Sequence, residues 1–316
     1  MNKIGSSETT RAACSDSQTL FSTTFTQRSQ RSQLPSGATQ HTQHTQHTQL
    51  CCVNQCVNQC VWGGEGRGEE SCVNTKAFKK NLIYKIHFSY WLAGLIDGDG
   101  FLGVCKQNYT SCEITVGEKG YNLLTIIKKR LGGKISKRTN AKAYRWRLHN
   151  KKGMERLVHI INGKLLLDSK KIQLQKVCKV LNIEYNQEAT FCKDTYWTTG
   201  FYEAEGYFHI NSHNLQCNIT VSQKTSQLLE KLKLFFGGNV YYDKSWNGYL
   251  YSASCVKSLQ NWFNYFARFP LKSHKNINLL RFKRVILFKE RKYHLSQNEK
   301  HKKRFYKLLN IFKDKL

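Results

Sequence analysis

The chain repeats itself at an interval of about 106 residues, and this duplication limits the possible fold more than any other feature. SYWLAGLIDGDGFLGV at 89–104 aligns with TYWTTGFYEAEGYFHI at 195–210. Three further pairs follow in the same order: ITVGEKGYNLL at 114–124 with ITVSQKTSQLL at 219–229, LGGKI at 131–135 with FGGNV at 236–240, and KKIQL at 170–174 with KNINL at 275–279. The sequence therefore predicts two halves of one architecture, related by an approximate twofold axis.

Both copies predict the same order of elements. An apolar helix, at 89–98 in the first copy, ends in an acidic motif and precedes two strands, a helix, two strands and a basic helix. The expected strands are 101–109, 111–117, 133–138 and 143–150, then 207–214, 216–223, 238–245 and 248–255. The expected helices are 119–131, 152–163 and 170–182, then 225–235, 257–267 and 275–291. The predicted fold class is α+β.

Residues 1–76 differ in composition from the rest. They are rich in Ser, Thr and Gln and include HTQHTQHTQ, so they offer little apolar surface to offset the ordering of the chain. We expect a disordered extension, explained equally well by an organellar transit peptide or an upstream reading-frame extension. Its CVNQCVNQCV repeat lacks a partner pair at zinc-finger spacing and is not expected to bind zinc. The two halves are then expected at 77–188 and 189–316, the second with a basic helical tail.

The positive charge belongs to the part of the chain that is expected to fold. The formal net charge is +29, and residues 77–316 hold 44 Lys and Arg against 16 Asp and Glu. Interleaved with aromatic residues, this excess points to a nucleic-acid partner. No apolar run approaches the roughly 18 residues that a membrane-spanning helix needs, so we predict a soluble protein without a membrane partner.

Small residues recur on the helix that carries the acidic motif. Gly94 and Gly98 lie four apart, and Gly200 and Ala204 take the equivalent places in the second copy. Residues at this spacing share one helix face, and small ones let two backbones approach closely. We expect the two motif helices to pack together along the pseudo-twofold axis, which would bring their C-terminal ends side by side.

Those helix ends carry acids: Asp97 and Asp99 in the first copy, Glu203 and Glu205 in the second. The C-terminus of a helix is already partly negative, so carboxylates there repel it and one another. A divalent cation would offset this, and Mg²⁺ fits best because it prefers carboxylates plus substrate phosphates. Their recurrence in a strongly basic chain disfavours merely solvated acids. The pattern indicates two-metal phosphodiester hydrolysis.

These motifs carry a resemblance to a known family. LAGLIDGDG at 92–100 and the divergent copy TTGFYEAEG at 198–206 resemble the paired signature of single-chain LAGLIDADG homing endonucleases, over roughly residues 85–290. The first motif departs from the family name only in Gly98, where the name has alanine. The resemblance implies two αββαββα halves joined at the motif helices, with saddle-shaped antiparallel sheets that grip the major groove of a long DNA target.

The resemblance also implies roles for the motif residues. The last acid of each motif binds a divalent metal at the scissile phosphates, and by position these acids are Asp99 and Glu205. The expected metal sites also include Gly98 and Ala204, which directly precede them. The cofactor would be Mg²⁺, with Mn²⁺ able to substitute. The other acids of the motifs would serve the helix ends and local hydrogen bonding.

Further catalytic candidates follow from the same resemblance. A water-organising polar residue ends the second strand in many members, and V-G-E-K and V-S-Q-K supply Glu118 and Gln223. A basic residue in the loop before the last helix assists the developing charge. Lys275 matches it in the second half, whereas Lys170 and Lys171 are separated by a one-residue ambiguity in the first.

Polar and basic residues of the predicted sheets are candidate DNA contacts. In the first half they are Lys106, Gln107, Asn108, Tyr109, Lys137, Arg138, Arg145 and Arg147. In the second half they are His209, Asn211, His213, Asn214, Tyr242, Lys244 and Tyr251. Strand alternation fixes their faces only to within a one-residue slip. We expect His209 and His213 on the same side of one strand, as nucleic-acid contacts or simply exposed side chains rather than metal ligands.

The resemblance implies a monomeric, Mg²⁺-dependent endonuclease that cuts both strands of a long asymmetric DNA site across the minor groove. It would leave short 3′ overhangs and promote mobility of a host intron. The alternative is a maturase that binds its own intron RNA with the same fold and charge; acids in both motifs favour cleavage. The richness in Lys, Asn and Ile suggests an AT-biased genome, and with this family a chloroplast or mitochondrial reading frame.

Overall fold

The structure, a computed structural model, describes residues 75–313. The expected disordered extension, apart from its last two residues, and the CVNQ repeat lie outside the described residues. The first described residues already belong to a helix, α2, which spans Thr75–Asp99 and ends in the first acidic motif. This helix begins well before the predicted 89–98.

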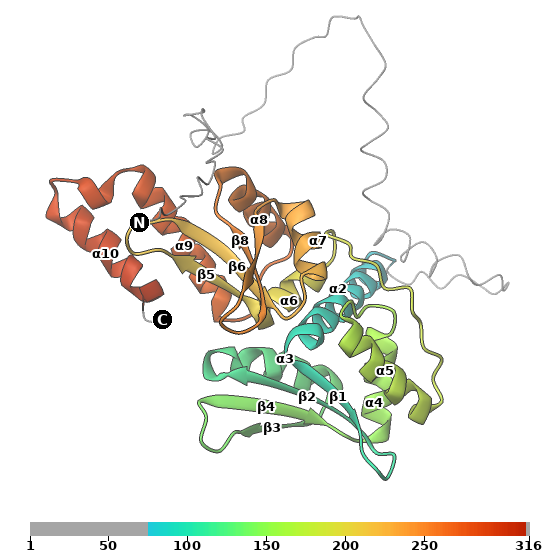
Figure 1. The fold of residues 1–316 in the computed structure, drawn as a ribbon. Coiled ribbons are helices and arrows are strands. Elements are labelled where there is room, and N and C mark those ends of the chain that lie inside the picture. The colour runs from blue at the N-terminus through green and yellow to red at the C-terminus, as the bar shows by residue number, and fades with distance from the viewer. Residues whose placement is uncertain (1–74, 314–316) are drawn as a thin grey trace, which may run out of the picture. The chain divides into compact units, whose positions relative to one another are not determined.

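The element order repeats as the sequence predicts (Figure 1). After α2 the first half contains β1 (Gly100–Val104), β2 (Thr110–Gly117), a 3₁₀ turn η1 (Glu118–Gly120), α3 (Tyr121–Leu131), β3 (Lys134–Lys137), β4 (Ala143–Leu148), α4 (Lys151–Ile161) and α5 (Asp168–Leu181). The second half contains α6 (Trp197–Glu205), β5 (Gly206–Ile210), β6 (Cys217–Gln223), α7 (Gln227–Phe236), β7 (Asn239–Asp243), β8 (Gly248–Ala253), α8 (Val256–Arg268), α9 (His274–Glu290), η2 (Tyr293–Leu295) and α10 (Glu299–Lys313). The predicted α+β class is confirmed.

Each half forms a four-stranded antiparallel sheet with the same strand order, β1-β2-β4-β3 and β5-β6-β8-β7. Apolar residues alternate along each central strand, so one face of each sheet is buried. In the first sheet Ile114 pairs with Trp146, and both are fully buried. In the second, Ile219 pairs with Ala253 in the same way. The opposite faces carry the polar side chains and are called here the open faces.

The two motif helices, α2 and α6, pack against each other through their glycines (Figure 1). A Cβ atom added to Gly94 would lie 2.0 Å from the Trp197 carbonyl oxygen, and one added to Gly200 would lie 1.9 Å from the Trp91 carbonyl oxygen. Only residues without a side chain allow the backbones to come this near. The expected interface at these glycines is therefore present, and it brings the ends of the two helices together.

Gly98, where the family name has alanine, packs against Ala204 of the other motif helix. A Cβ atom at Gly98 would lie 2.3 Å from the Ala204 Cβ, so the two positions have room for one methyl group. We predict that Gly98→Ala lowers the free energy of unfolding by about 1–3 kcal/mol through overpacking. Adding Ala204→Gly should restore most of the loss, because contacting sites are not additive. Urea unfolding of the wild type, the two single variants and the double variant measures the coupling between the two positions, and additive losses would contradict the prediction.

The strands are shorter than predicted at the hairpin ends. The first strand stops at Val104 rather than 109, and the equivalent strand of the second half stops at Ile210 rather than 214. Left-handed backbone at Asn108 (φ 60°) and Leu215 (φ 54°) turns the chain between the strands and ends the pairing there. No helix within 75–313 is both long and apolar enough to cross a membrane.

Candidate active site and nucleic-acid face

Asp99 and Glu205 are the last residues of α2 and α6, so the helix pairing brings them together. A Cβ atom at Gly98 would lie only 3.2 Å from the Glu205 Cγ. Gly100 and Gly206 follow and begin the first strand of each sheet. Two carboxylates from opposite halves therefore meet where the helices end and the sheets begin.

Their surroundings raise the pKa of both acids. Burial raises the pKa of Glu205 to about 7, and the nearby charge of Asp99 adds to this shift. Part of the Asp99 side chain reaches solvent, but the surrounding protein desolvates the carboxylate enough to raise its pKa to about 6. Lys275 and Lys170 oppose both shifts. The pair thus combines crowding of like charge with partial loss of water, a situation that a bound cation would relieve.

The first acid of each motif has a different task. Asp97 is buried and accepts hydrogen bonds from the backbone N–H groups of Leu166 (2.8 Å) and Leu167 (3.2 Å) and from the Trp197 Nε1 (2.9 Å). Burial raises its pKa to about 7, against the effect of these donors. Asp97 thus makes hydrogen bonds at the helix end, as expected, although its partners lie 69 to 100 residues away along the chain.

Glu203 does the same in the second half. Its carboxylate accepts hydrogen bonds from the N–H groups of Lys272 and Ser273 (2.9 Å to Ser273) and from the Ser273 hydroxyl. Ser273 caps α9, and its side-chain oxygen accepts from the Lys275 N–H at 3.0 Å. In both halves the first acid thus fixes the loop that leads to a lysine-bearing helix.

Those helices direct one lysine each at a motif-helix end. The Lys275 Nζ donates to the carbonyl oxygens of Glu203 and Gly206, both at 2.7 Å. The Lys170 Nζ donates to the Gly100 carbonyl oxygen in the equivalent place. Lys171 instead pairs with Asp168 at 3.3 Å. Of the two candidates, Lys170 is therefore the one whose amine lies in the place equivalent to that of Lys275.

Two pockets flank the helix ends, and each combines both halves. One, of about 500 Å³, is lined by Asp99 and Glu118 from the first half and by Ala204 and Lys275 from the second. The His274 Nδ1 lies 2.9 Å from the Lys119 carbonyl oxygen and links the halves there.

The other pocket, of about 630 Å³, is lined by Gly98 and Lys170 from the first half and by Gln223 and Lys231 from the second. The candidate residues thus assemble into composite sites, each drawing on both copies of the repeat.

The side-chain donors at the helix ends determine which metal ions could bind there. Among residues 75–313, no group of three or more His, Cys, Asp or Glu side chains is arranged to hold a metal ion. Asp99 and Glu205 would supply two oxygen ligands, and the rest would come from backbone, water or substrate phosphates. This mixture is typical of Mg²⁺. The two acids, with Gly98 and Ala204 beside them, therefore fit a hard divalent cation.

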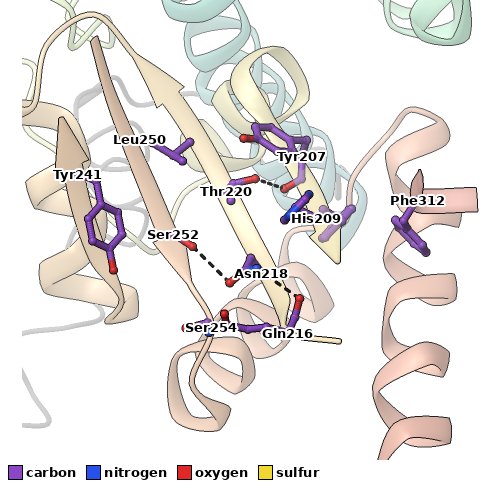
Figure 2. A pocket seen from close by; sticks show the side chains of 11 residues that line it. Tyr207, His209, Gln216, Asn218, Thr220, Tyr241, Leu250, Ser252, Ser254 and Phe312 are labelled. Atoms are coloured by element: carbon purple, nitrogen blue, oxygen red, sulfur yellow. Dashed lines mark hydrogen bonds between the residues drawn. The ribbon is translucent and has the colours of Figure 1, made fainter. Parts of the chain in front are cut away.

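The register decides which candidate DNA contacts lie on the open faces. Arg145 and Arg147 lie on the first open face, where both pair with Glu113, at 3.1 and 2.7 Å. His209 lies on the second, opposite Asn218, as Figure 2 shows. These placements agree with a sheet face that presents basic and hydrogen-bonding side chains to a partner.

Three candidates lie on the buried side of their sheets, because strand alternation predicts the face of a residue only to within one position. Lys137 pairs with Tyr144 on the side of the buried face, and Tyr242 pairs with Tyr249 on the corresponding side of the second sheet. Tyr251 is fully buried, and its hydroxyl donates to the Gly237 carbonyl oxygen at 2.7 Å. The prediction of open-face contacts is wrong for these residues.

The remaining candidates lie in exposed loops rather than on strands. The hairpin loop after β1 holds Lys106, Gln107, Asn108 and Tyr109, and the loop after β5 holds Asn211, His213 and Asn214. Arg138 directly follows β3, and Lys244 lies in the turn before β8. Because β5 ends at Ile210, the expectation that His209 and His213 share a strand is wrong.

Sequence reasoning missed Trp197 and Ser273 as partners of the first motif acids. The only available signal was their place in the repeat, because an acid at a helix end does not reveal a donor about 70 or 100 residues away. It also missed the link from His274, whose equivalent in the first half is Ser169.

Two of the known proteins that this chain resembles are named as intron-encoded proteins. A Saccharomyces cerevisiae protein named intron-encoded RNA maturase bI4 is 38% identical over 206 residues, covering 62% of this chain and 32% of the relative. A Debaryomyces hansenii protein named probable intron-encoded endonuclease aI2 is 34% identical over 226 residues, covering 66% and 34%. The matched region thus spans about a third of the length of these two relatives.

The fold has solved counterparts. The LAGLIDADG meganuclease I-AabMI, solved bound to uncleaved DNA, superimposes with a TM-score of 0.55 over 70% of this chain and 97% of that one, at 19% identity. At this identity the similarity concerns the fold alone. The model of the LAGLIDADG endonuclease family matches residues 92–181 and 198–286, one match in each half. The chain therefore belongs to the LAGLIDADG endonuclease family.

Proposed function

We propose that this chain is a site-specific, divalent-metal-dependent endonuclease that cuts both strands of a long, asymmetric double-stranded DNA target. The observation that carries the proposal is the meeting of Asp99 and Glu205 at two helix ends, where burial and mutual repulsion raise the pKa of Glu205. Family membership and the basic open face of the first sheet support the same activity. Because both halves belong to one chain, we propose that a monomer suffices.

The proposed roles follow from the positions of the side chains. Asp99 and Glu205 would hold Mg²⁺, or Mn²⁺ in its place, beside Gly98 and Ala204. When bound, the metal would activate water and stabilise the leaving oxygen. Glu118 and Gln223, one in each composite pocket, would orient the attacking water by hydrogen bonding.

The two lysines at the helix ends have a proposed electrostatic role. Their amines lie beside the C-terminal carbonyl groups and near the acids, where their positive charge limits the rise in the pKa of Asp99 and Glu205 that burial causes. Lys170 and Lys275 would therefore favour the charged carboxylates and face the negative charge that develops on the phosphate.

We predict that Lys170→Met lowers the cleavage rate by about 10–100-fold, the range typical of groups that support a metal site. Lys171→Met is the matched control, because the Lys171 amine pairs with an exposed acid at 3.3 Å, a type of pair that contributes little. Single-turnover cleavage of a target duplex measures both. Equal losses, or a loss only in Lys171→Met, would contradict the assignment of Lys170.

The test of the proposed function uses a supercoiled plasmid that carries the uninterrupted, intron-lacking insertion site of the host gene. The full chain with Mg²⁺ should produce linear DNA cut at one position with short 3′ overhangs. EDTA should prevent this cutting, and a plasmid without the junction should remain intact. Failure to cut the junction plasmid, with either Mg²⁺ or Mn²⁺, would reject the proposal.

An RNA maturase is the second candidate, because the relative that is 38% identical carries that name. The same basic fold would then bind the intron RNA of its own transcript. Promotion of intron mobility, and an organellar origin in a chloroplast or mitochondrion, are proposals that accompany the endonuclease reading. The intron-encoded relatives support the first of these.

A further inference from the structure

The last helix, α10, lies beyond the part of the chain that the family model matches, which ends at residue 286. It packs along β5, the edge strand of the second sheet, and against α9 (Figure 1). Within the described part of the first half, α5 lies along the equivalent edge strand, and its Gln173 side chain accepts a hydrogen bond from the Leu102 N–H at 3.0 Å. The second half thus has one helix more than the repeat requires.

Helix α10 has a defined position. Its side chains Phe305, Leu309 and Phe312 are buried, and the Phe312 ring packs against that of Phe282 in α9 with centroids 6.1 Å apart. The turn that leads into it is held by a three-ring stack. Tyr293 lies between Phe288 (4.5 Å) and His301 (4.2 Å), and the planes are within 19° and 7° of parallel. The helix is therefore a packed extension of the second half.

The outward side of α10 is basic. Lys300, Lys303, Arg304 and Lys307 are all exposed and follow the spacing i, i+3, i+4, i+7, which puts them in one stripe opposite the buried residues. We call these four residues the basic stripe. Residues 286–313 hold nine Lys and Arg against two Glu, and one of those, Glu299, pairs with Lys302 rather than with the stripe.

The helix also borders the open face of the second sheet. Phe312 lines a pocket of about 610 Å³ together with Tyr207, His209 and Asn218 of that face, as Figure 2 shows. At the same edge, the Lys289 Nζ at the end of α9 donates to the Leu215 carbonyl oxygen in the hairpin loop at 2.8 Å. The apolar side of α10 thus borders the open face that is proposed to read DNA.

Covering an exposed strand edge explains the apolar side of α10 but not its outer side. A helix that serves only as a cover gains nothing from four neighbouring cations, which repel one another. A polyanion such as the phosphate backbone of a duplex offsets that repulsion.

We propose that α10 is an added DNA-binding element whose basic stripe contacts the phosphates of the double-stranded target, beyond the segment under the second sheet. Its 15 residues span about 22 Å, or roughly six base pairs of additional duplex. This inference rests on the proposed function, since it assigns further contacts to the same DNA.

The test compares the full-length wild type with a variant in which the four stripe residues are changed to Ser. A second variant, Lys128→Ser/Lys129→Ser/Lys151→Ser/Lys152→Ser, is the matched control, because it removes the same charge from exposed positions on α3 and α4. Both helices pack on the buried side of the first sheet. Thermal unfolding should show that both variants fold like the wild type, because every changed side chain is exposed.

Binding is then measured on duplexes of the insertion site that are shortened stepwise from the end nearer the second half. The wild type should lose affinity about tenfold or more when the outermost segment is removed, whereas the stripe variant should be weak on the long duplex and indifferent to shortening. The slope of log affinity against log salt should fall by up to about four for the stripe variant. The control variant should behave like the wild type.

Three results would overturn the proposal. If the stripe variant kept wild-type affinity and length dependence, the basic stripe would make no added DNA contacts, and the proposed endonuclease function would be unaffected. A loss confined to binding of the intron RNA would assign the stripe to RNA. Absence of DNA binding by the wild type would reject the proposed function and this inference together.

Discussion

Changing Asp99 to Asn, or Glu205 to Gln, is expected to slow double-strand cleavage by more than about 100-fold. Loss of a group that only supports a metal ligand already lowers activity by about 10–100-fold, and these acids would bind the metal themselves. Each substitution keeps the shape of the side chain and removes the charge that would hold the cation. Binding of DNA should be retained or slightly strengthened, since a negative group near the phosphates is lost. The separation of binding from cleavage distinguishes a catalytic acid from a structural one.

The measurement is the rate at which a supercoiled target plasmid becomes linear in Mg²⁺, with affinity for the same site measured in parallel. Glu230→Gln is the control, because Glu230 is an exposed acid on α7 that pairs with Lys233 at 3.4 Å, away from the helix ends. Wild-type cleavage by either motif variant would show that its acid is dispensable.

The interface between α2 and α6 has no room for added side chains at its glycines. Gly94→Ala and Gly200→Ala should each lower the free energy of unfolding by about 3 kcal/mol or more, at the upper end of overpacking costs. The added methyl groups would lie 2.0 and 1.9 Å from backbone carbonyl oxygens, which cannot move unless the helices separate. This cost outweighs the gain of about 1 kcal/mol that alanine brings to a helix interior.

For a domain pair of this size the expected loss corresponds to a fall in melting temperature of roughly 6–12 °C. Gly117→Ala is the matched control, because a Cβ atom there meets nothing within 4 Å and its φ of −61° suits any residue. Unchanged melting temperatures in Gly94→Ala and Gly200→Ala would mean that the helices do not approach as closely as described.

The parts of the fold that the sequence could predict are those that repeat or alternate. The duplication and the small residues at positions 94, 98, 200 and 204 revealed the paired helices, because helix periodicity is a local property. Strand ends were less accessible, since turn geometry at Asn108 and Leu215 decides where pairing stops. The one-residue slips at Lys137 and Tyr242 have the same origin, because pairing across the sheet fixes register.

The candidate site was predictable in its acids but not in the contacts that organise it. Asp97 reaches donors in the other half and in a distant loop, and nothing near it in the sequence indicates them. Lys170 and Lys171 are equivalent in composition and differ only in what their amines contact. Tertiary packing also determines the place of α10, whose basic residues alone suggested no more than a helical tail.

Whether the paired acids make this chain a DNA endonuclease can be decided in one reaction. The full chain is offered the uninterrupted insertion-site duplex and the intron RNA together in Mg²⁺, with Asp99→Asn/Glu205→Gln run beside it. The proposed function predicts one double-strand break in the DNA by the wild type and none by the double variant. Intact DNA in both reactions, with the wild type bound tightly to the RNA, would contradict it and favour the maturase.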